Sequence, residues 1–312
     1  MFDKAGIINI LKPPGMTSFD AVNHLKYDLE ADKAGHTGTL DPLAAGVLPI
    51  CINRATKIIP FLPEDIKVYH CEILLGKTTD TLDREGKVVD TSDSWGHLSR
   101  MEVKDCLKEF QGEIEQIPPM YSAVKKDGRR LYELARNGRE VERDPRTVKI
   151  YEIEIIDIEL PILQIKVRCG SGTYIRSLAR DLGKKLGCGG MLNFLIRTGS
   201  GPFKIENSLL LQEITECDKS EKQLISPSRP LNFPEAEIKP GAVKKAINGA
   251  NLNLTDLKDD REKIFKKAEK YQSDDIKFIV RGPDGLFISI SQLRDGDNFI
   301  LKPKRVFNLE ED

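Results

Sequence analysis

The chain has 312 residues, of which 39% are hydrophobic and 31% are charged. This composition can bury a substantial core and excludes a disordered chain, and the length suits one large domain or two unequal ones. No apolar run approaches the ~20 residues that a membrane-spanning helix needs. The N-terminus has neither the basic segment nor the small-residue cleavage site of a signal peptide.

Six cysteines are scattered along the chain without a C-x-x-C pair. This spacing matches neither a zinc framework nor a disulfide lattice, and it is typical of free thiols in a reducing compartment. The sequence therefore predicts a cytoplasmic globular protein that does not enter a membrane.

The net charge of −1 argues against indiscriminate binding of nucleic acids. The basic residues are nevertheless concentrated, because nine basic and five acidic residues lie between Tyr121 and Lys149. Such a local excess suits a specific polyanion such as a folded RNA. A solvated surface segment with mixed charges would have the same composition.

The N-terminal half is expected to alternate strands and helices. An apolar run predicts a buried strand over 7–11, and Ser18 can cap the helix that follows. Alternating apolar residues predict a strand over 68–75. Ser99 and Glu102 have the spacing of a capping box, so a second helix should begin there and end at Gly112.

The middle of the chain carries two long strand candidates. Residues 148–160 and 163–169 flank Pro161, which suggests a tight antiparallel connection. Thr173 can cap a helix that Gly187 ends. A further strand is expected over 191–197.

The C-terminal part differs in character. Three short strands are expected there, punctuated by Gly-Pro and Asp-Gly turns: 278–280, 286–290 and 299–301. Strands and helices do not alternate regularly, so the sequence predicts an α+β fold with a mixed, mostly antiparallel sheet. We expect a catalytic domain over 1–216, a linker over 217–235 and a small β-rich domain over 236–312.

Asp41 is the first candidate for chemistry. It lies in the loop Gly35-His-Thr-Gly-Thr-Leu-Asp-Pro-Leu-Ala-Ala-Gly46, between glycines that permit close approach of the backbone to a ligand. Pro42 forces Asp41 out of the helical region. An Asp-Pro pair can also simply open a turn or cap a helix.

Arg176 is the second candidate. It falls in the first turn of its predicted helix, where a cation opposes the helix dipole, so a buried carboxylate partner would explain its position. An arginine beside an aspartate keeps the acid ionised, as a nucleophile requires. An ordinary structural ion pair would explain Arg176 equally.

No motif for a metal ion or nucleotide cofactor is complete. The stretch Leu75-Gly-Lys-Thr-Thr79 resembles the end of a phosphate-binding loop, but Cys71 stands where the loop requires a glycine. The four histidines form no ligand cluster. The sequence therefore predicts neither a cofactor nor a metal.

Five strings, in order, resemble the TruB family, the bacterial tRNA pseudouridine-55 synthases. They are Lys12-Pro-Pro-Gly-Met-Thr-Ser18, the Asp41 loop, Ala55-Thr-Lys57, Tyr69 with Thr79-Asp-Thr-Leu-Asp83-x-x-Gly86, and Gly172-Thr-Tyr-Ile-Arg176. They span about two thirds of the chain. Asn53-Arg54 precedes the third string where a glycine is more usual, but asparagine also tolerates a left-handed backbone.

The resemblance implies an RNA isomerase that needs no cofactor. Asp41 would be the nucleophile, attacking the sugar or the base, and Arg176 would pair with it. Tyr69 would stack on the uracil and help remove its C5 proton. His36 would fill the space left by the nucleotides that flip out of the T-loop. Lys12, Lys57 and Asp83 would belong to the substrate pocket.

The resemblance also assigns the RNA contacts. The segment 121–149 would be a clamp on the RNA backbone, with Lys125, Lys126, Arg129 and Arg130 as contacts, and the C-terminal domain would be a PUA-like RNA-binding module. The partner would be the T-arm of tRNA, bound by a monomer without an obligate protein partner. The alternatives are a non-catalytic tRNA-binding or folding factor, and a synthase acting on a different RNA.

Overall fold

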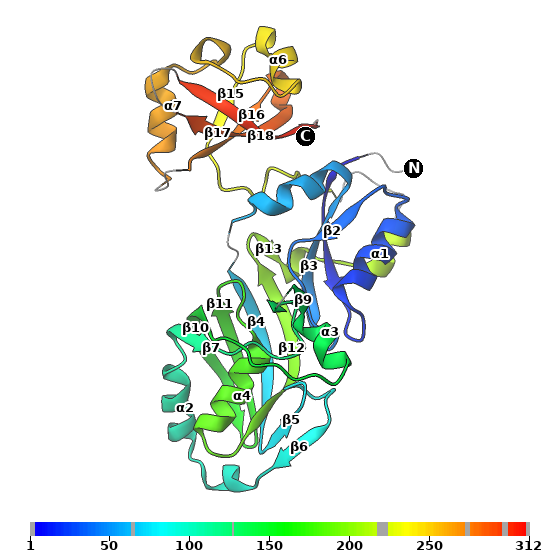
Figure 1. Ribbon diagram of the computed structural model, residues 1–312, viewed down its shortest axis with the longest axis vertical. Coiled ribbons are helices and arrows are strands. Elements are labelled where there is room, and N and C mark those ends of the chain that lie inside the picture. Colours follow the sequence, from blue (N-terminus) through cyan, green and yellow to red (C-terminus); the bar gives the residue numbers. More distant parts are fainter. Residues whose placement is uncertain are drawn as a thin grey trace.

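The computed structural model describes residues 4–63, 66–126, 128–216, 224–271, 275–294 and 299–309. Within these ranges the chain forms one large sheet, one four-stranded sheet and two short hairpins. The four-stranded sheet, built from the C-terminal part, stands at one end of the large sheet (Figure 1). No helix in this part of the chain is both long and apolar enough to cross a bilayer.

The large sheet has a mixed, mostly antiparallel order. Its path runs through β14 (Leu209–Leu210), β1 (Gly6–Lys12), β3 (Ala45–Ile52), β12 (Gly190–Ser200), β4 (Lys67–Leu75), β11 (Ile162–Cys169), β10 (Arg146–Glu159) and β7 (Gly112–Gln116). Two short strands lie off this path: β2 (Ala34–His36) on β3 and β13 (Phe203–Lys204) on β12. Only β1–β14 and β3–β12 are parallel among the described pairs of this sheet. The predicted α+β fold is confirmed.

Helices cover one face of the large sheet. They are α1 (Ser18–Asp28), α2 (Arg100–Lys108), α4 (Ile175–Lys185) and α5 (Leu211–Glu216). The alternation of strand side chains separates two layers: on β1, Ile8 and Ile10 join the core beneath the helices, whereas Ile7 faces the opposite side. The Asp41 loop and Tyr69 lie at the helix-covered face, since Leu40, Leu43 and Tyr69 belong to this core.

Two of the predicted helix caps are wrong. Thr17, not Ser18, caps α1, and its hydroxyl and the Asp20 carboxylate form a capping box. Ser18 is instead buried, because its hydroxyl bonds the loop of Asp41. Likewise Tyr174, not Thr173, stands at the N-cap of α4, without a side-chain cap.

Other local predictions hold. The capping box of Ser99 and Glu102 begins α2, although this helix ends at Lys108, before Gly112. Asn53 adopts a left-handed backbone with φ 53°, and its side-chain amide donates to the carbonyl of Lys4. The asparagine thus serves as the turn residue that the sequence implied.

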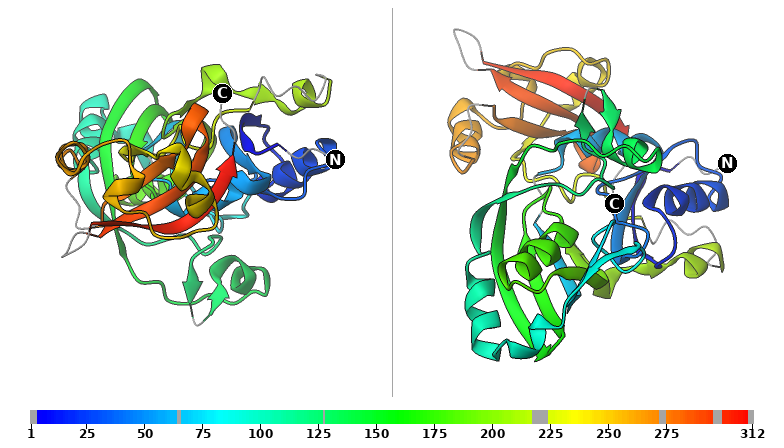
Figure 2. Two further views of the ribbon diagram at one scale, coloured as in Figure 1. Left: turned by 90° about the horizontal axis from the view of Figure 1, so that it is seen from above. Right: turned by 60° about the horizontal axis from the view of Figure 1, so that its bottom comes forward.

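The basic segment leaves the sheet between β7 and β10. It contains the hairpin of β8 (Lys125–Lys126) and β9 (Arg129–Arg130), followed by α3 (Leu131–Arg136). Figure 2 shows this segment projecting from the body of the molecule in its left view. The basic segment was predicted over 121–149; from here on, the name clamp refers to residues 117–145, which connect β7 to β10. A second hairpin, formed by β5 (Lys77–Thr79) and β6 (Val88–Thr91), follows the C-terminal end of β4.

The C-terminal sheet packs against two hydrophobic cores: one of its own and one that it shares with the large sheet. It comprises β15 (Glu235–Glu237), β16 (Lys277–Arg281), β17 (Phe287–Arg294) and β18 (Ile300–Leu309), with α6 (Val243–Ile247) and α7 (Arg261–Ala268) beside it. Phe287 and Phe307 stack with ring centroids 4.5 Å apart, in a cluster with Ile7, Val47 and Ile58. That cluster joins the C-terminal sheet to the uncovered face of β1 and β3.

Short 3-10 helices complete the described chain. They span Asn53–Phe61, Ser94–His97, Ile205–Asn207, Pro240–Ala242, Leu254–Asp256 and Pro283–Gly285. Part of the predicted linker lies outside the described residues. In the described part, Ile225 exchanges both backbone hydrogen bonds with Ile7 of β1. The domain boundaries stay a prediction.

Candidate active site

The loop of Asp41 is held from both sides by backbone contacts. The Ser18 hydroxyl donates to the carbonyl of Leu40 at 3.0 Å and accepts from its N–H at 2.8 Å. The N–H of Gly15 donates to the carbonyl of Pro42. Since the residues on each side of Asp41 are fixed in this way, its carboxylate is presented from a rigid loop.

Arg176 is the direct partner of Asp41. Its Nη2 lies 2.8 Å from Asp41 Oδ1, and the side chain of Arg176 is 5% exposed whereas that of Asp41 is 30% exposed. A buried cation thus meets a carboxylate that still reaches solvent. Such a charge-assisted bond fixes the orientation of the acid.

Asp83 completes an acid–arginine–acid row. Its Oδ2 lies 3.6 Å from Arg176 Nη1. Thr81 Oγ1 and the N–H of Glu85 donate to its Oδ1. Burial raises the pKa of Asp83, opposed by the Thr81 hydrogen bond and the Arg176 charge. Asp83 is buried, so it supports Arg176 rather than reaching a substrate.

Lys12 is not placed as expected of a residue that contacts substrate. Its side chain is fully buried, and Nζ donates to the carbonyls of Pro13, Met16 and Pro42 at 2.8, 2.7 and 3.4 Å. Burial lowers the pKa of Lys12 to about 8, against the attraction of Asp41. The lysine cross-links two loops and supports the backbone that follows Asp41.

Tyr69 lies on β4, opposite Arg197 on β12. Burial raises the pKa of Tyr69, whereas the charge of Arg197 and a hydrogen bond from it act in the opposite direction. A guanidinium beside the phenol favours the phenolate form more than the apolar core alone would. The ring sits in the core cluster that also contains Leu40 and Leu43.

Arg197 is a site residue that the sequence reading missed. It is 1% exposed, and it donates to the carbonyls of Val47, Thr39 and Gly38 at 2.8, 3.2 and 3.0 Å. The guanidinium therefore links the loop before Asp41 to the strand after it. Its position at the end of an otherwise apolar strand was the one sequence feature that could have indicated a buried functional arginine.

His36 ends β2, at the entrance to the Asp41 loop. Its Nδ1 is buried without a hydrogen-bond partner among the described groups. Burial and the nearby Arg197 charge lower the pKa of His36. The imidazole is therefore neutral near pH 7, which suits stacking against a base better than pairing with phosphate.

Lys57 is not brought to this cluster. It is exposed on the 3-10 helix that follows β3, and its Nζ donates to the carbonyl of Val306 on β18. The structure does not place Lys57 beside Asp41 and Arg176, because this helix turns toward the C-terminal sheet. Lys57 bridges the two sheets instead.

The four clamp cations lie together on the β8–β9 hairpin. Lys125, Arg129 and Arg130 are exposed. Lys126 donates to the carbonyl of Glu142, and Arg130 donates to the Tyr132 hydroxyl at 3.1 Å. Most of this charge is free to meet a polyanion.

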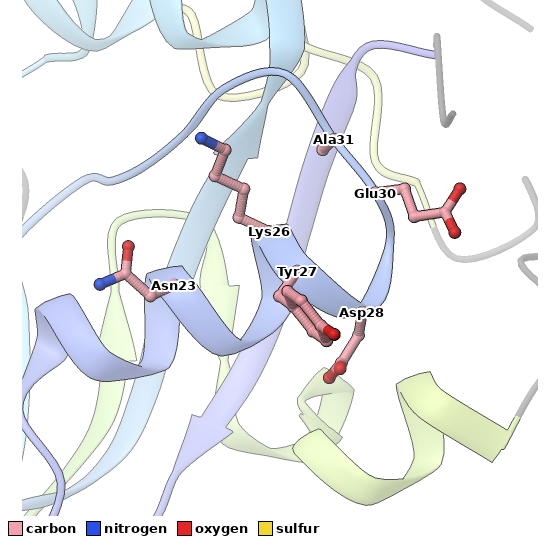
Figure 3. Close-up of a pocket in the computed structure, with 6 residues that line it drawn as sticks. All are labelled: Asn23, Lys26, Tyr27, Asp28, Glu30 and Ala31. Carbon is pink, nitrogen blue, oxygen red and sulfur yellow. The ribbon is translucent and has the colours of Figure 1, made fainter.

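Two pockets lie on the described surface, one beside the clamp and one beside α1. One, of about 390 Å³, lies between the clamp and the β5–β6 hairpin, lined among others by Leu82, Tyr121 and Arg180. The other, of about 660 Å³, lies along the outer side of α1 and contains none of the expected site residues (Figure 3). No group of three metal-ligating side chains occurs among the described residues.

Two family models match the sequence. The model of the TruB family pseudouridylate synthase (N terminal domain) matches residues 26–175. The model of the tRNA pseudouridylate synthase B C-terminal domain matches residues 176–231. Together they cover the Asp41 loop, Tyr69, the clamp and Arg176.

Curated relatives are similar over most of the chain. The tRNA pseudouridine synthase B of Clostridium kluyveri is 46% identical over 272 residues, which is 85% of this chain and 93% of the relative. That of Caldanaerobacter subterraneus subsp. tengcongensis is 41% identical over 304 residues, 97% of this chain and 99% of the relative.

Solved structures share the fold. A crystal structure of a Cbf5–Nop10–Gar1 complex contains a chain with a TM-score of 0.72 and 27% identity, covering 98% of this chain and 85% of that one. An H/ACA RNP bound to a substrate RNA containing 2′-deoxyuridine gives a TM-score of 0.69 at 25% identity, covering 97% and 84%. The family models, the curated relatives and the shared fold agree, and the chain belongs to the TruB family of pseudouridylate synthases, which are isomerases.

Proposed function

We propose that this protein isomerises uridine 55 in the T-loop of tRNA to pseudouridine, with Asp41 as the nucleophile. One observation carries the proposal: the side chain of Asp41 is 30% exposed, and its carboxylate is held on a rigid loop 2.8 Å from a buried arginine. The relatives named tRNA pseudouridine synthase B supply the substrate class. A nucleophile must be oriented and reachable, and the bond to Arg176 together with the exposed part of the Asp41 side chain supports both.

The reaction exchanges one bond to the sugar for another. Asp41 attacks the target nucleotide at the sugar or the base, the bond from C1′ to N1 breaks, and the uracil turns within the pocket. A bond from C1′ to C5 then forms, the bond between Asp41 and the nucleotide breaks, and the carboxylate is regenerated. C5 loses its hydrogen as a proton and N1 gains a proton, so the product is an isomer of the uridine. A hydrolase would need a second carboxylate to activate water, but Asp83 is buried against Arg176 and is not available for that role.

Tyr69 and His36 are assigned to the base. We infer that the Tyr69 ring stacks on the uracil and that its hydroxyl assists removal of the C5 proton, with Arg197 stabilising any phenolate character. A uridine stacked in the T-loop must flip out to reach Asp41. A neutral His36 can then occupy the space that the flipped nucleotides leave.

The wider RNA contacts follow from charge. The clamp cations would hold the phosphate backbone of the T-arm, and the C-terminal sheet would act as a PUA-like module on the same tRNA. We further propose a cytoplasmic monomer, since free buried cysteines such as Cys71 and Cys169 suit a reducing compartment.

The test is pseudouridine formation in an unmodified T-arm stem-loop, mapped by carbodiimide-dependent primer-extension stops without added metal or nucleotide. Wild type should give a stop at the T-loop uridine. Asp41→Asn should give none, yet bind the RNA within a few-fold of wild type. Asp105→Asn, which changes an exposed acid on α2, is the matched control and should retain the stop.

Two outcomes would redirect the proposal. RNA binding without a stop from wild type would favour a binding factor or a synthase with another RNA target. A large loss of affinity in Asp41→Asn would make Asp41 a structural residue.

A further inference from the structure

Gln116 stands where the clamp leaves the large sheet. It is the last residue of β7, and its partner in the register is Arg146, the first residue of β10. The clamp therefore begins directly after Gln116 and ends directly before Arg146. The two strands that carry these residues, β7 and β10, are neighbours at one edge of the sheet (Figure 1). Gln116 is only 1% exposed, so its amide must find partners inside the protein.

Both atoms of that amide bond one residue of α4. The Nε2 of Gln116 donates to the carbonyl of Tyr174 at 3.0 Å, and its Oε1 accepts from the N–H of Tyr174 at 2.8 Å. Tyr174 is the N-cap of α4, and no side chain from its own helix caps it. The amide therefore fixes the start of the helix two residues before Arg176.

Further bonds run between the same two segments. The hydroxyl of Ser177 and the Nη2 of Arg180 both donate to the carbonyl of Ile117, at 2.8 and 3.2 Å. Nη2 of Arg176 donates to the carbonyl of Tyr121 at 2.9 Å. The root of the clamp is thus held along successive turns of α4.

The bond to Tyr121 matters because the same nitrogen serves Asp41. Nη2 of Arg176 carries two hydrogens; it donates to Tyr121 in the clamp and to Asp41 Oδ1 at 2.8 Å. The planar guanidinium fixes the angle between these two donations. A shift of the clamp root would therefore turn the arginine relative to the acid.

We propose that Gln116 is a positioning residue that locks the clamp root to α4, so that the clamp, Arg176 and Asp41 keep one relative geometry. The inference rests on the proposed role of Asp41. RNA affinity depends on the charge of the clamp, which Gln116 does not supply. Loss of the lock therefore lowers kcat and leaves KM for RNA nearly unchanged.

Gln116→Met removes both hydrogen bonds and keeps a side chain of similar length. The readout is release of tritium from C5-labelled uridines in a full-length unmodified tRNA transcript. We expect kcat to fall about ten- to a hundredfold, the range for a misplaced catalytic group, while KM changes by less than about threefold.

The matched control is Thr147→Val. Thr147 Oγ1 donates to the carboxylate of Glu115 at 2.5 Å, one residue pair along the same two strands, and Thr147 is exposed. This variant should keep the wild-type kcat. An equal loss in Thr147→Val would mean that the strand pair as a whole, and not the bond to Tyr174, is what matters.

Gln116→Glu separates positioning from a general loss of folding. A protonated carboxyl has one donor and one acceptor, like the amide, whereas a carboxylate can only accept and would face the Tyr174 carbonyl. Burial raises the pKa of such an acid. The kcat of Gln116→Glu, divided by that of wild type at the same pH, should therefore recover as the pH falls from about 8 to about 5.5.

Three results would overturn the inference: a wild-type kcat in Gln116→Met, an effect on KM alone, or no recovery of Gln116→Glu at low pH. Recovery in Gln116→Glu and none in Gln116→Met supports it.

A transcript with cytidine at position 55 separates this test from the proposed function. Tritium release from that transcript by wild type would refute the target position, while the comparison of Gln116 variants would still stand.

Discussion

At the scale of single residues, the site depends on backbones that pass unusually close to one another. Gly46 of β3 pairs with Arg197 in the parallel contact with β12 and has a φ of +119°. A Cβ built there would lie 2.2 Å from the carbonyl oxygen of Arg197. Because that neighbour is backbone, it cannot move aside without disturbing the arginine that braces the Asp41 loop.

Gly46→Ala should therefore destabilise the fold by about 3 kcal/mol, from overpacking together with the positive φ. Gly15→Ala is the comparison, since Gly15 also has a positive φ of +80° but no atom within 4 Å of a built Cβ. It should cost about 1 kcal/mol. Urea unfolding of both variants checks this, and equal decreases in stability would show that the close approach to Arg197 is unimportant.

Lys12 gives a prediction on pH. Below about pH 8 the ammonium is charged in both folded and unfolded protein; between about 8 and 10.5 it is charged only in the unfolded protein. The unfolded state then binds more protons, so folding stability rises with pH across this window.

The measurement is the free energy of unfolding of wild type minus that of Lys12→Met at a series of pH values. This difference should rise between about pH 8 and 10.5 and be flat below pH 8. A difference that stays flat across this window would mean that the folded state retains the charged lysine.

At the scale of elements, the clamp and α4 divide the work between binding and chemistry. The β8–β9 hairpin carries exposed cations, whereas α4 carries the buried Arg176. Phosphate contacts release counterions, so each one contributes to the salt dependence of RNA binding. The clamp should therefore govern affinity and its slope against salt.

Replacement of Lys125, Lys126, Arg129 and Arg130 by glutamine should weaken RNA binding. The slope of log affinity against log salt should become shallower by about 0.7 to 0.9 for each phosphate that the variant no longer neutralises. Filter binding across a salt series measures this. The control is Lys104→Gln with Lys108→Gln on α2, which should leave the slope almost unchanged; an unaltered slope in the clamp variant would exclude the clamp as the RNA-binding element.

At the scale of the whole molecule, the two sheets share a core. Phe307 of β18 is 1% exposed and lies in the cluster that contains Ile7 and Val47 of the large sheet. The C-terminal part is therefore joined to the catalytic part by burial of apolar surface, in addition to the connecting chain. Unfolding of one sheet should affect the other.

Phe307→Ala should lower stability by about 3 to 5 kcal/mol. Trp95, the single tryptophan, packs against the core of the large sheet and reports its unfolding. The Trp95 fluorescence transition should shift to lower denaturant in Phe307→Ala, and less in Phe278→Ala, whose ring belongs to the separate C-terminal core. A Trp95 transition that Phe307→Ala does not move would mean that the two sheets unfold independently.

The sequence by itself determined features that depend on neighbouring residues. The capping box of Ser99 with Glu102, the left-handed turn at Asn53 and the alternating strand 68–75 are local, and the structure has all three. A cation in the first turn of a helix suggested an acid partner for Arg176, the resemblance to the TruB family identified that acid as Asp41, and the structure has this pair.

Only the tertiary structure decided features that depend on distant segments. The burial of Lys12, the direction of Lys57 toward β18, the brace of Arg197 and the lock of Gln116 each join residues far apart in sequence. Composition and periodicity carry no record of which carbonyl a side chain will meet. That is settled by strand register and by the requirement that every buried polar group find a partner.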